Sequence, residues 1–392
     1  MRILTINAGS SSLKVASYDM SGAGRRTLTM EAERIGRPGS RMRISGDGAG
    51  TWLDDERPLD DHASAFSAFV EWARQHHVDL APDAVGHRLV HGGRAHRNPE
   101  RLTADVLADL EALAPIDPDH LPQAIGVIRA VSAAFPGVPQ VACFDTAFHQ
   151  SMPAVAQRYP LPPEMSDAID VIRYGFHGLS CEFIVSALTD IDASAARGRL
   201  VIAHLGNGAS LTAVRDGLSL DTTMGFTPTG GIMMGTRAGD LDPGVLLYLQ
   251  RGKGLGADDV DRLVNYEAGL AGVSGTSGDM RDLLERESYD TRAAAAVDLF
   301  CYLARKALGG LVAALRGLDT LVFTGGIGEH AAPVRARIAA DFEFLGLALD
   351  PDRNARHAPV ISRDDSRVVV RVIATNEDVV IARHTQRLLA SS

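Results

Sequence analysis

The sequence predicts an α/β protein made of two similar domains, each with a mixed β-sheet flanked by helices. Apolar, strand-like segments alternate along the chain with segments of helical spacing. Two strand pairs, at 2–18 and 200–216, share one layout: an apolar run, a turn of glycine and small polar residues, and a second run. The length of 392 residues also exceeds what one core usually organises. We interpret the repeated strand pair as a duplicated domain.

The remaining elements follow in chain order. Further strands are predicted at 83–93, 138–149, 320–330 and 366–378. Helices are predicted at 62–77, 103–113, 122–134, 178–189, 242–250, 258–266, 291–316, 332–344 and 377–390. Proline-containing segments after residue 150 indicate a boundary nearby. We therefore expect an N-terminal domain at 1–148, completed by a C-terminal helix at 379–392, and a second domain at 149–378.

Composition excludes several classes of protein. The net charge of -10 disfavours a nucleic-acid-binding protein, although a site can be locally basic. No uninterrupted apolar run approaches the roughly 18 residues of a membrane span, and the N-terminus does not resemble a signal peptide. The three cysteines, Cys143, Cys181 and Cys301, are widely spaced, which favours reduced, packed thiols and a cytoplasmic protein.

Three small-residue loops could bind phosphate. They are Asn7–Ser12 followed by Lys14, His204–Ser210, and Phe323–Glu329. Glycines let a phosphate approach the backbone, and exposed N–H groups and hydroxyls donate to it. Each of the first two alone is as well explained by an ordinary hairpin turn. Together the three loops resemble those of the actin, hexokinase and sugar-kinase superfamily, so we expect a nucleotide cleft between two actin-like (ribonuclease H-like) domains. There is no P-loop or Rossmann motif.

Charged residues in apolar or glycine-rich contexts are the candidates for chemistry. Asp145 ends an apolar run and Glu377 lies in Thr375–Asp378, so both could bind Mg²⁺ through oxygen ligands. A helix N-terminus explains the second acidic group equally well. Arg88, His177 and Arg237 are cationic candidates, with structural salt bridges as the alternative.

This set of residues discriminates between two kinds of kinase. A sugar kinase must take a proton from an alcohol and so needs an aspartate base. A carboxylate acceptor is already ionised near neutral pH, and its obstacle is repulsion by the γ-phosphate. Arginines, a histidine and Mg²⁺ meet that need.

The motifs, taken together, resemble the acetate kinase family over essentially the whole chain. The N-terminal segment NAGSSSLK at 7–14 and MMGTRAGDLDP at 233–243 are similar to its two signatures. GHRLVHGG, FDTAFH, YGFHG, HLGNGAS, TTMGFTP and TNED also occur in the family order.

The resemblance implies ATP-dependent, reversible, direct in-line phosphorylation of a short-chain carboxylate, with acetate as the expected acid. Propionate or another small acid is the alternative, and an actin-like, nucleotide-gated binding protein without acyl kinase activity is the alternative class. It implies Mg²⁺ or Mn²⁺ as cofactor, ATP as co-substrate, and a homodimer formed through the second domain. The implied catalytic residues are Arg88, Asp145, His177 and Arg237, with Asn7 and Glu377 at the metal. The implied nucleotide-binding residues are Lys14, His204, Leu205, Gly206, Asn207, Gly208, Asp279, Met280, Arg281, Gly325, Gly326, Ile327 and Gly328. The implied acyl pocket contains Arg88, Val90, Ile116 and Pro228.

The chain departs from the family pattern on the acyl side. Asp117 stands where a histidine is usual, so either Asp117 points away, or His120 substitutes for that histidine, or the acid differs. Thr229 and Gly230 replace residues that include a carboxylate, and Cys181 stands where a histidine is common.

Overall fold

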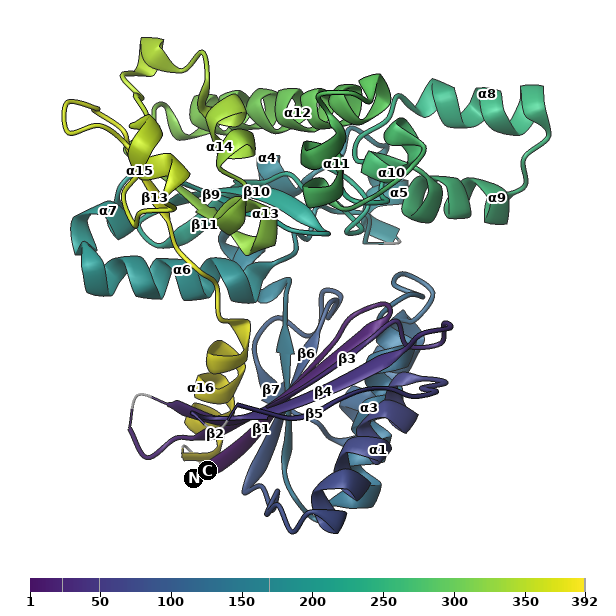
Figure 1. Cartoon of the computed structure of the whole chain (residues 1–392). Coiled ribbons are helices and arrows are strands. Elements are labelled where there is room, and N and C mark those ends of the chain that lie inside the picture. The colour runs from purple at the N-terminus through teal and green to yellow at the C-terminus, as the bar shows by residue number, and fades with distance from the viewer. Residues whose placement is uncertain (23, 49, 169, 391–392) are drawn as a thin grey trace. The chain divides into compact units, whose positions relative to one another are not determined.

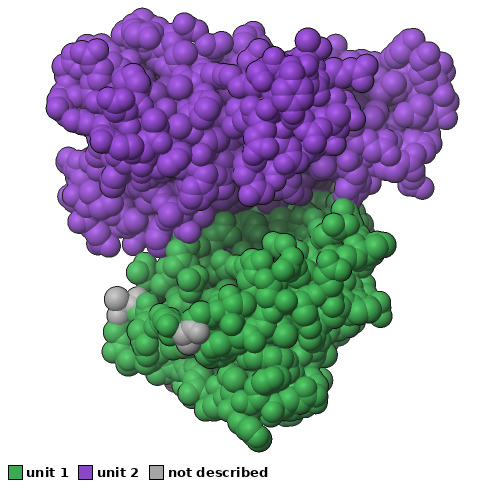
Figure 2. All heavy atoms as spheres, in the orientation of Figure 1, with its two compact units in different colours: residues 1–147, 376–392 green, residues 148–375 purple. Residues whose placement is uncertain are grey.

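The computed structural model describes residues 1–22, 24–48, 50–168 and 170–390. The chain forms two compact units, coloured separately in Figure 2. Unit 1 contains residues 1–147 and the segment from Asn376 onwards, and unit 2 contains residues 148–375. Unit 1 is therefore assembled from both ends of the chain, whereas unit 2 is one continuous segment.

Unit 1 contains a mixed sheet of eight strands in the order β5-β4-β3-β2-β1-β6-β8-β7. Strand β1 pairs antiparallel with β2 and parallel with β6, and β6 pairs parallel with β8. The strands are β1 (Arg2–Ala8), β2 (Ser12–Asp19), β3 (Arg25–Glu33), β4 (Arg41–Gly46), β5 (Gly50–Glu56), β6 (Ala84–Leu89), β7 (Glu100–Arg101) and β8 (Gln140–Phe144).

Helices cover both faces of this sheet (Figure 1). They are α1 (His62–Gln75), α2 (Ala104–Leu113), α3 (Leu121–Ala134) and α16 (Glu377–Ala390). Helices α1 and α3 pack together on one face over a core that includes Leu4 and Phe66, and α16 lies against β1 and β6 on the other. Gly86 on β6 permits that close approach, because a Cβ there would lie 2.5 Å from the side chain of Ile381 on α16.

Unit 2 contains a mixed sheet of five strands in the order β11-β10-β9-β12-β13. They are β9 (Leu200–Leu205), β10 (Ala209–Arg215), β11 (Leu218–Thr222), β12 (Thr320–Thr324) and β13 (Val369–Val372). Helices α6 and α7 pack on one face, and α12 and α13 on the other (Figure 1). The helices are α4 (Ala154–Gln157), α5 (Pro163–Ala168), α6 (Gly178–Ile191), α7 (Ala193–Arg197), α8 (Pro243–Lys253), α9 (Ala257–Arg262), α10 (Gly269–Ser274), α11 (Met280–Arg286), α12 (Thr291–Leu315), α13 (Gly325–His330), α14 (Ala332–Ala339) and α15 (Pro351–Ala355).

The two sheets share a five-strand topology. The order β3-β2-β1-β6-β8 in unit 1 matches β11-β10-β9-β12-β13 in unit 2. In both, the first strand of a hairpin pairs in parallel with a later strand, which pairs in parallel with the next. The prediction of an α/β fold with two similar mixed sheets flanked by helices is confirmed.

Individual elements agree with the sequence to different degrees. The helix predicted at 291–316 is α12, which Asp290 caps at its start and which ends where Arg316 adopts a left-handed conformation. The helix predicted at 377–390 is α16, Glu377–Ala390. The glycine turn expected after β12 is instead helix α13. The three cysteines are buried and form no disulfide with one another.

Candidate active site

Three predicted residues of unit 1 meet at one edge of its sheet. Asn7 lies near the end of β1, Arg88 near the end of β6, and Asp145 directly after β8. These strands are parallel neighbours, so their carboxyl ends lie side by side. Arg88 Nη2 donates to Asp145 Oδ2 at 2.5 Å, and Arg88 Nη1 donates to Asn7 Oδ1 at 2.8 Å.

Glu377, the first residue of α16, completes this group. Asn7 Nδ2 donates to Glu377 Oε2 at 3.1 Å, and Arg88 Nε lies 3.9 Å from the same oxygen. Asn7 thus bridges the arginine and the glutamate. We call Asn7, Arg88, Asp145 and Glu377 the carboxylate–arginine cluster.

Burial and charge shift the pKa values within the cluster. Burial alone would lower the pKa of Arg88, but Asp145, Glu377 and Asp117 outweigh it, and that pKa is raised. Burial raises the pKa of Glu377, and the nearby carboxylates Asp145 and Asp378 raise it further against the opposing effect of Arg88. Two acidic groups and one arginine therefore leave an excess of negative charge that a cation can offset.

The donors of the cluster fit a divalent cation. Asp145 is fully buried, and its Oδ1 has no hydrogen-bond partner among the described residues. A buried carboxylate oxygen is costly unless it binds a cation or a donor. Mg²⁺ needs only one or two protein carboxylates when phosphates and water supply the other ligands. Asp145 and Glu377 could hold it, while Asn7 Oδ1 is engaged by Arg88.

Lys14, on β2, lies at the N-terminus of α16. Its Nζ is 3.2 Å from Asp378 Oδ2 and 4.0 Å from Glu31. The side chain stays 39% exposed, so it remains accessible to a ligand. Its role in nucleotide binding stays a prediction.

The predicted acyl-side residues of unit 1 lie near a buried acid–histidine pair. Val90, directly after β6, is 5% exposed, and Ile116 is half-buried. Asp117 points to His120, with 2.7 Å between Oδ1 and Nδ1. Asp117 therefore has a hydrogen-bond partner, His120, inside unit 1.

In unit 2, two histidines stack on each other. The ring centroids of His177 and His204 are 4.2 Å apart. His177 Nδ1 is 2.9 Å from Ser210 Oγ, and His204 Nδ1 is 2.8 Å from Ser180 Oγ. His177 also has a left-handed backbone, with φ 58° and ψ 27°, at the start of α6. Such a conformation costs about 1–3 kcal/mol and is retained where the surroundings hold it.

The turn Gly206–Gly208 lies beside this histidine pair and Arg237. A Cβ on Gly208 would be 3.2 Å from His177 Nε2 and 3.7 Å from Arg237 Nη1. Arg237 Nη1 also donates to the Pro228 carbonyl at 3.3 Å. The structure thus brings together three predicted groups of unit 2: the histidine, the arginine and the glycine turn.

A pocket of about 540 Å³ lies next to the same turn. It contains seven predicted nucleotide-binding residues: Gly206, Asn207, Asp279, Met280, Arg281, Gly326 and Ile327. The sequence interpretation missed Gly278, Leu284, His330, Ala331 and Pro333, whose only signal was their place beside the glycine motifs. Its lining of apolar groups, backbone and a few polar side chains suits a planar ring with a polar tail.

Six predicted nucleotide-binding residues do not line this pocket. They are Lys14 of unit 1 and, in unit 2, His204, Leu205, Gly208, Gly325 and Gly328. Gly325 has φ +76°, and a Cβ there would lie 2.7 Å from the Leu205 carbonyl oxygen. Gly325 therefore packs the start of α13 against β9, beneath the pocket.

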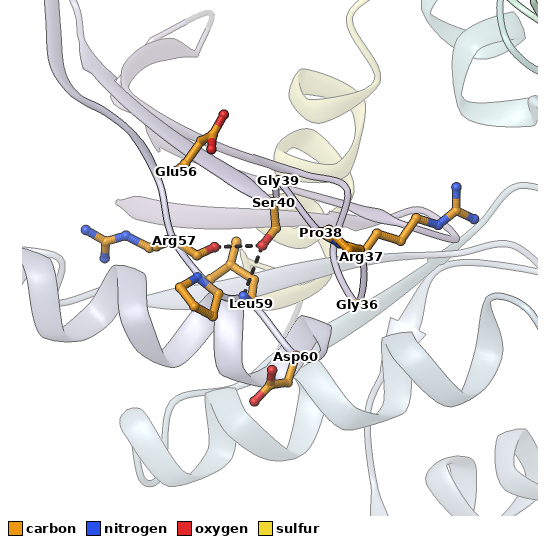
Figure 3. A pocket seen from close by; sticks show the side chains of 10 residues that line it. Gly36, Arg37, Pro38, Gly39, Ser40, Glu56, Arg57, Leu59 and Asp60 are labelled. Carbon is orange, nitrogen blue, oxygen red and sulfur yellow. Dashed lines mark hydrogen bonds between the residues drawn. The ribbon is translucent and has the colours of Figure 1, made fainter.

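Unit 1 also has a pocket, of about 520 Å³, between the loops 36–40 and 56–60 (Figure 3). Ser40 Oγ there donates to the Arg57 carbonyl at 2.6 Å and accepts from Leu59 N–H. Arg57 itself pairs with Asp55 at 2.7 Å. These polar groups hold the two loops together, and the pocket contains none of the predicted site residues.

Comparison with known proteins agrees with this geometry. The family model described as the acetokinase family matches residues 2–383. An acetate kinase of Nitrobacter hamburgensis is 43% identical over 397 residues, covering 99% of this chain and 96% of that protein.

The chain belongs to the acetokinase family.

Two solved structures are similar to this chain over nearly its full length. A Porphyromonas gingivalis acetate kinase is 36% identical with a TM-score of 0.89, and a Francisella tularensis propionate kinase is 34% identical with a TM-score of 0.92. Each comparison covers 99% of both chains. The family resemblance drawn from the motifs is confirmed.

No helix in the described ranges combines the length and apolar character needed to cross a membrane. Within the same ranges, no group of three or more histidine, cysteine, aspartate or glutamate residues is arranged to hold a metal.

Proposed function

We propose that this acetokinase-family chain phosphorylates acetate with ATP, reversibly and by direct in-line transfer. Family membership over the whole chain supports the activity. The observation that carries the chemistry is the carboxylate–arginine cluster, in which a buried arginine and two carboxylates meet at the ends of parallel strands.

The acceptor explains which groups are needed. Acetate is ionised near neutral pH, so no general base has to activate it. The barrier comes from bringing a carboxylate to a phosphate that is also negative, and fixed positive groups and hydrogen-bond donors lower it. Arg88 and Arg237 are proposed to hold the carboxylate and the transferring phosphoryl group, with Val90, Ile116 and Pro228 around the methyl group.

The histidine pair supplies a second means of charge stabilisation. Ser210 lies at the Nδ1 side of His177, and Nε2 lies beside the Gly206–Gly208 turn. From there His177 is proposed to donate to an oxygen of the transferring group. The turn itself is proposed to donate from backbone N–H groups to nucleotide phosphates.

Mg²⁺, or Mn²⁺ in its place, would be held by Asp145 and Glu377, with support from Asn7. When bound, it neutralises phosphate oxygens. The adenosine is proposed to occupy the pocket that contains Met280, Arg281 and Ile327.

We also propose a homodimer. Helices α8 and α12 of unit 2 expose large apolar side chains, which is unusual unless a partner covers them. They include Leu247 (46% exposed), Tyr248 (61%), Leu299 (38%) and Tyr302 (54%). A dimeric mass in sedimentation equilibrium, and a monomeric mass for Tyr248→Asp/Tyr302→Asp, are the expected results.

The activity is tested by trapping the acyl phosphate. The purified protein is incubated with ATP, Mg²⁺ and either acetate, propionate or butyrate, and hydroxylamine converts the product to an acyl hydroxamate. We expect the highest kcat/KM with acetate. A higher value with propionate would reassign the acid, and no hydroxamate with any of the three would overturn the proposal. ATP binding without acid-dependent turnover would indicate a nucleotide-gated binding protein instead.

A further inference from the structure

A buried acid–histidine pair lies in the turn between α2 and α3 of unit 1. Asp117 and His120 are 3% and 8% exposed, and Asp117 Oδ1 is 2.7 Å from His120 Nδ1. Neither residue belongs to the carboxylate–arginine cluster. A carboxylate and an imidazole this deeply buried require a reason, because removing them from water is costly.

Local structure does not fully satisfy the carboxylate. Asp117 Oδ2 is buried and has no hydrogen-bond partner among the described residues. Leaving a buried acceptor unpaired costs about 1–3 kcal/mol. Asp117 is, however, one of the acidic groups that raise the pKa of Arg88. It therefore lies within electrostatic reach of the arginine that is proposed to bind the acid.

The histidine is the member of the pair that a ligand can reach. His120 retains 10% exposure of its side chain, against 3% for Asp117. Because Asp117 engages Nδ1, the opposite ring nitrogen, Nε2, is left to face a ligand. A buried aspartate that orients an imidazole in this way fixes its tautomer and stabilises the imidazolium form.

His120 has a titratable neighbour on another helix. His62, at the start of α1, interacts electrostatically with His120. Burial lowers the pKa of His62, and interactions with the backbone of Gly9 and Ser12 only partly offset this. His62 is therefore neutral near pH 7. Asp117 is the charged group in direct contact with His120.

We propose that His120 is a further substrate-binding residue of the acyl site and that Asp117 is its positioning residue. The His120 ring donates from Nε2–H to an oxygen of the acyl phosphate or of the acid that forms it. Asp117 accepts from Nδ1–H and balances the charge, so that the pair adds a donor without adding net charge beside Arg88. This inference rests on the proposed acyl kinase function.

The test is a set of variants assayed for hydroxamate formation with acetate. His120→Ala should lower kcat/KM for acetate about 100-fold, as loss of one preorganised donor does. His120→Gln, whose amide can donate, should recover at least part of that loss. Asp117→Asn should lower kcat/KM about tenfold, and Asp117→Asn/His120→Ala should match His120→Ala alone, because the aspartate acts through the histidine. KM for ATP should stay within about threefold of the wild-type value.

A matched control separates this role from a structural one. His96 also forms a buried pair with a carboxylate in unit 1, with Nδ1 2.7 Å from Glu100 Oε1. His96→Gln should leave kcat/KM for acetate unchanged. In unaltered protein labelled with ¹⁵N-histidine, acetate should shift the Nε2 resonance of His120 and leave that of His96 in place, which tests the contact even where a variant fails to fold.

The outcomes distinguish the two proposals. Wild-type protein that forms no hydroxamate overturns the acyl kinase function and this inference with it. Wild-type turnover together with full activity of His120→Ala, or an unmoved His120 resonance at saturating acetate, overturns this inference alone. Additive losses in the double variant would make Asp117 a structural residue and not a positioning one.

Discussion

Unit 1 carries polar and charged side chains at the ends of two neighbouring parallel strands, whereas unit 2 has glycines after the matching strands. Asn7 and Arg88 lie near the ends of β1 and β6 in unit 1, and Gly206 and Gly325 directly follow the matching strands β9 and β12 in unit 2. The same strand order therefore supports two chemistries. The buried charge cluster suits the proposed cation and small anion, whereas bare backbone suits the proposed polyanionic nucleotide.

The difference has an energetic consequence. In unit 1 the functional groups are one another's partners, since Arg88 contacts Asn7, Asp145 and Glu377. In unit 2, Arg237 donates to the Pro228 carbonyl, and the two histidines lie within hydrogen-bond distance of serine hydroxyls. Removing Arg88 from unit 1 therefore leaves the buried carboxylate of Asp145 without its counter-ion.

The largest expected effects come from the two arginines. Arg88→Ala should lower kcat at least about 1,000-fold. It should also destabilise unit 1 by about 3–5 kcal/mol, because it leaves the buried Asp145 without its counter-ion. Arg237→Ala should lower kcat by a similar factor, and loss of its hydrogen bond to the Pro228 carbonyl should cost about 1 kcal/mol.

Hydroxamate rates and thermal unfolding measured by circular dichroism check this pair of variants. For a unit of this size, the loss predicted for Arg88→Ala lowers the unfolding midpoint by roughly 10 °C. Equal midpoints for the two variants would contradict the contrast between the units. Near-normal turnover of Arg237→Ala would contradict its proposed role.

Substitutions of the adjacent glycines Gly325 and Gly326 in α13 should have effects of intermediate size. Each variant serves as the control for the other. A Cβ on Gly326 would meet no atom within 4 Å, and Gly326 lines the pocket of unit 2. Gly326→Val should thus raise KM for ATP about 10- to 100-fold without lowering the unfolding midpoint. Gly325→Ala should lower the midpoint instead, because of its φ of +76° and the contact with Leu205. A loss of stability in Gly326→Val would place that glycine in the packing rather than at the nucleotide.

The smallest effect concerns how unit 1 holds its C-terminal helix. Tyr18 Oη lies 3.2 Å from Asn376 Oδ1, and burial, reinforced by Asp378, raises the pKa of Tyr18 to about 12. Tyr18→Phe should cost about 1 kcal/mol at pH 8. Because the unfolded tyrosine ionises near pH 10, the folded protein retains the proton between pH 10 and about 12. The stability that Tyr18 contributes is therefore complete below pH 10 and falls by about 1.4 kcal/mol per pH unit above it.

Urea unfolding of the wild-type protein and of Tyr18→Phe at pH 8, 10 and 11 measures this pH dependence of stability. The wild-type protein should lose its advantage over Tyr18→Phe as the pH rises through that window. Parallel pH profiles for the two proteins would show that Tyr18 titrates normally.

Sequence patterns predicted the elements that carry strong signals. Helix α12 is long, rich in alanine and leucine, and bounded by Asp290 and Gly317, so its limits were predicted within one residue. Strands β3 to β5 gave no signal, because their exposed faces are charged or polar and their apolar residues are few. The cluster at Arg88 and Asp145 could be expected because parallel strands bring their ends together.

Other parts of the site depend on tertiary packing. Leu284, Ala331 and Pro333 line the nucleotide pocket, yet they are ordinary residues of α11 and the α13–α14 region. The partnership of Asp117 with His120 is local in sequence, but its relation to Arg88 depends on how the α2–α3 turn lies over the sheet. Neither could be obtained from spacing alone.

The construction of unit 1 from both chain ends has a consequence for synthesis. A ribosome completes residues 1–147 long before it reaches Asn376, and until then one face of the β1–β6 region lacks α16 and the cluster lacks Glu377. Unit 2, a continuous segment, can close while translation continues. The protein should thus complete the carboxylate–arginine cluster last. A nascent chain without its final helix would keep the pocket of unit 2 but expose an apolar sheet face of unit 1 to chaperones and proteases.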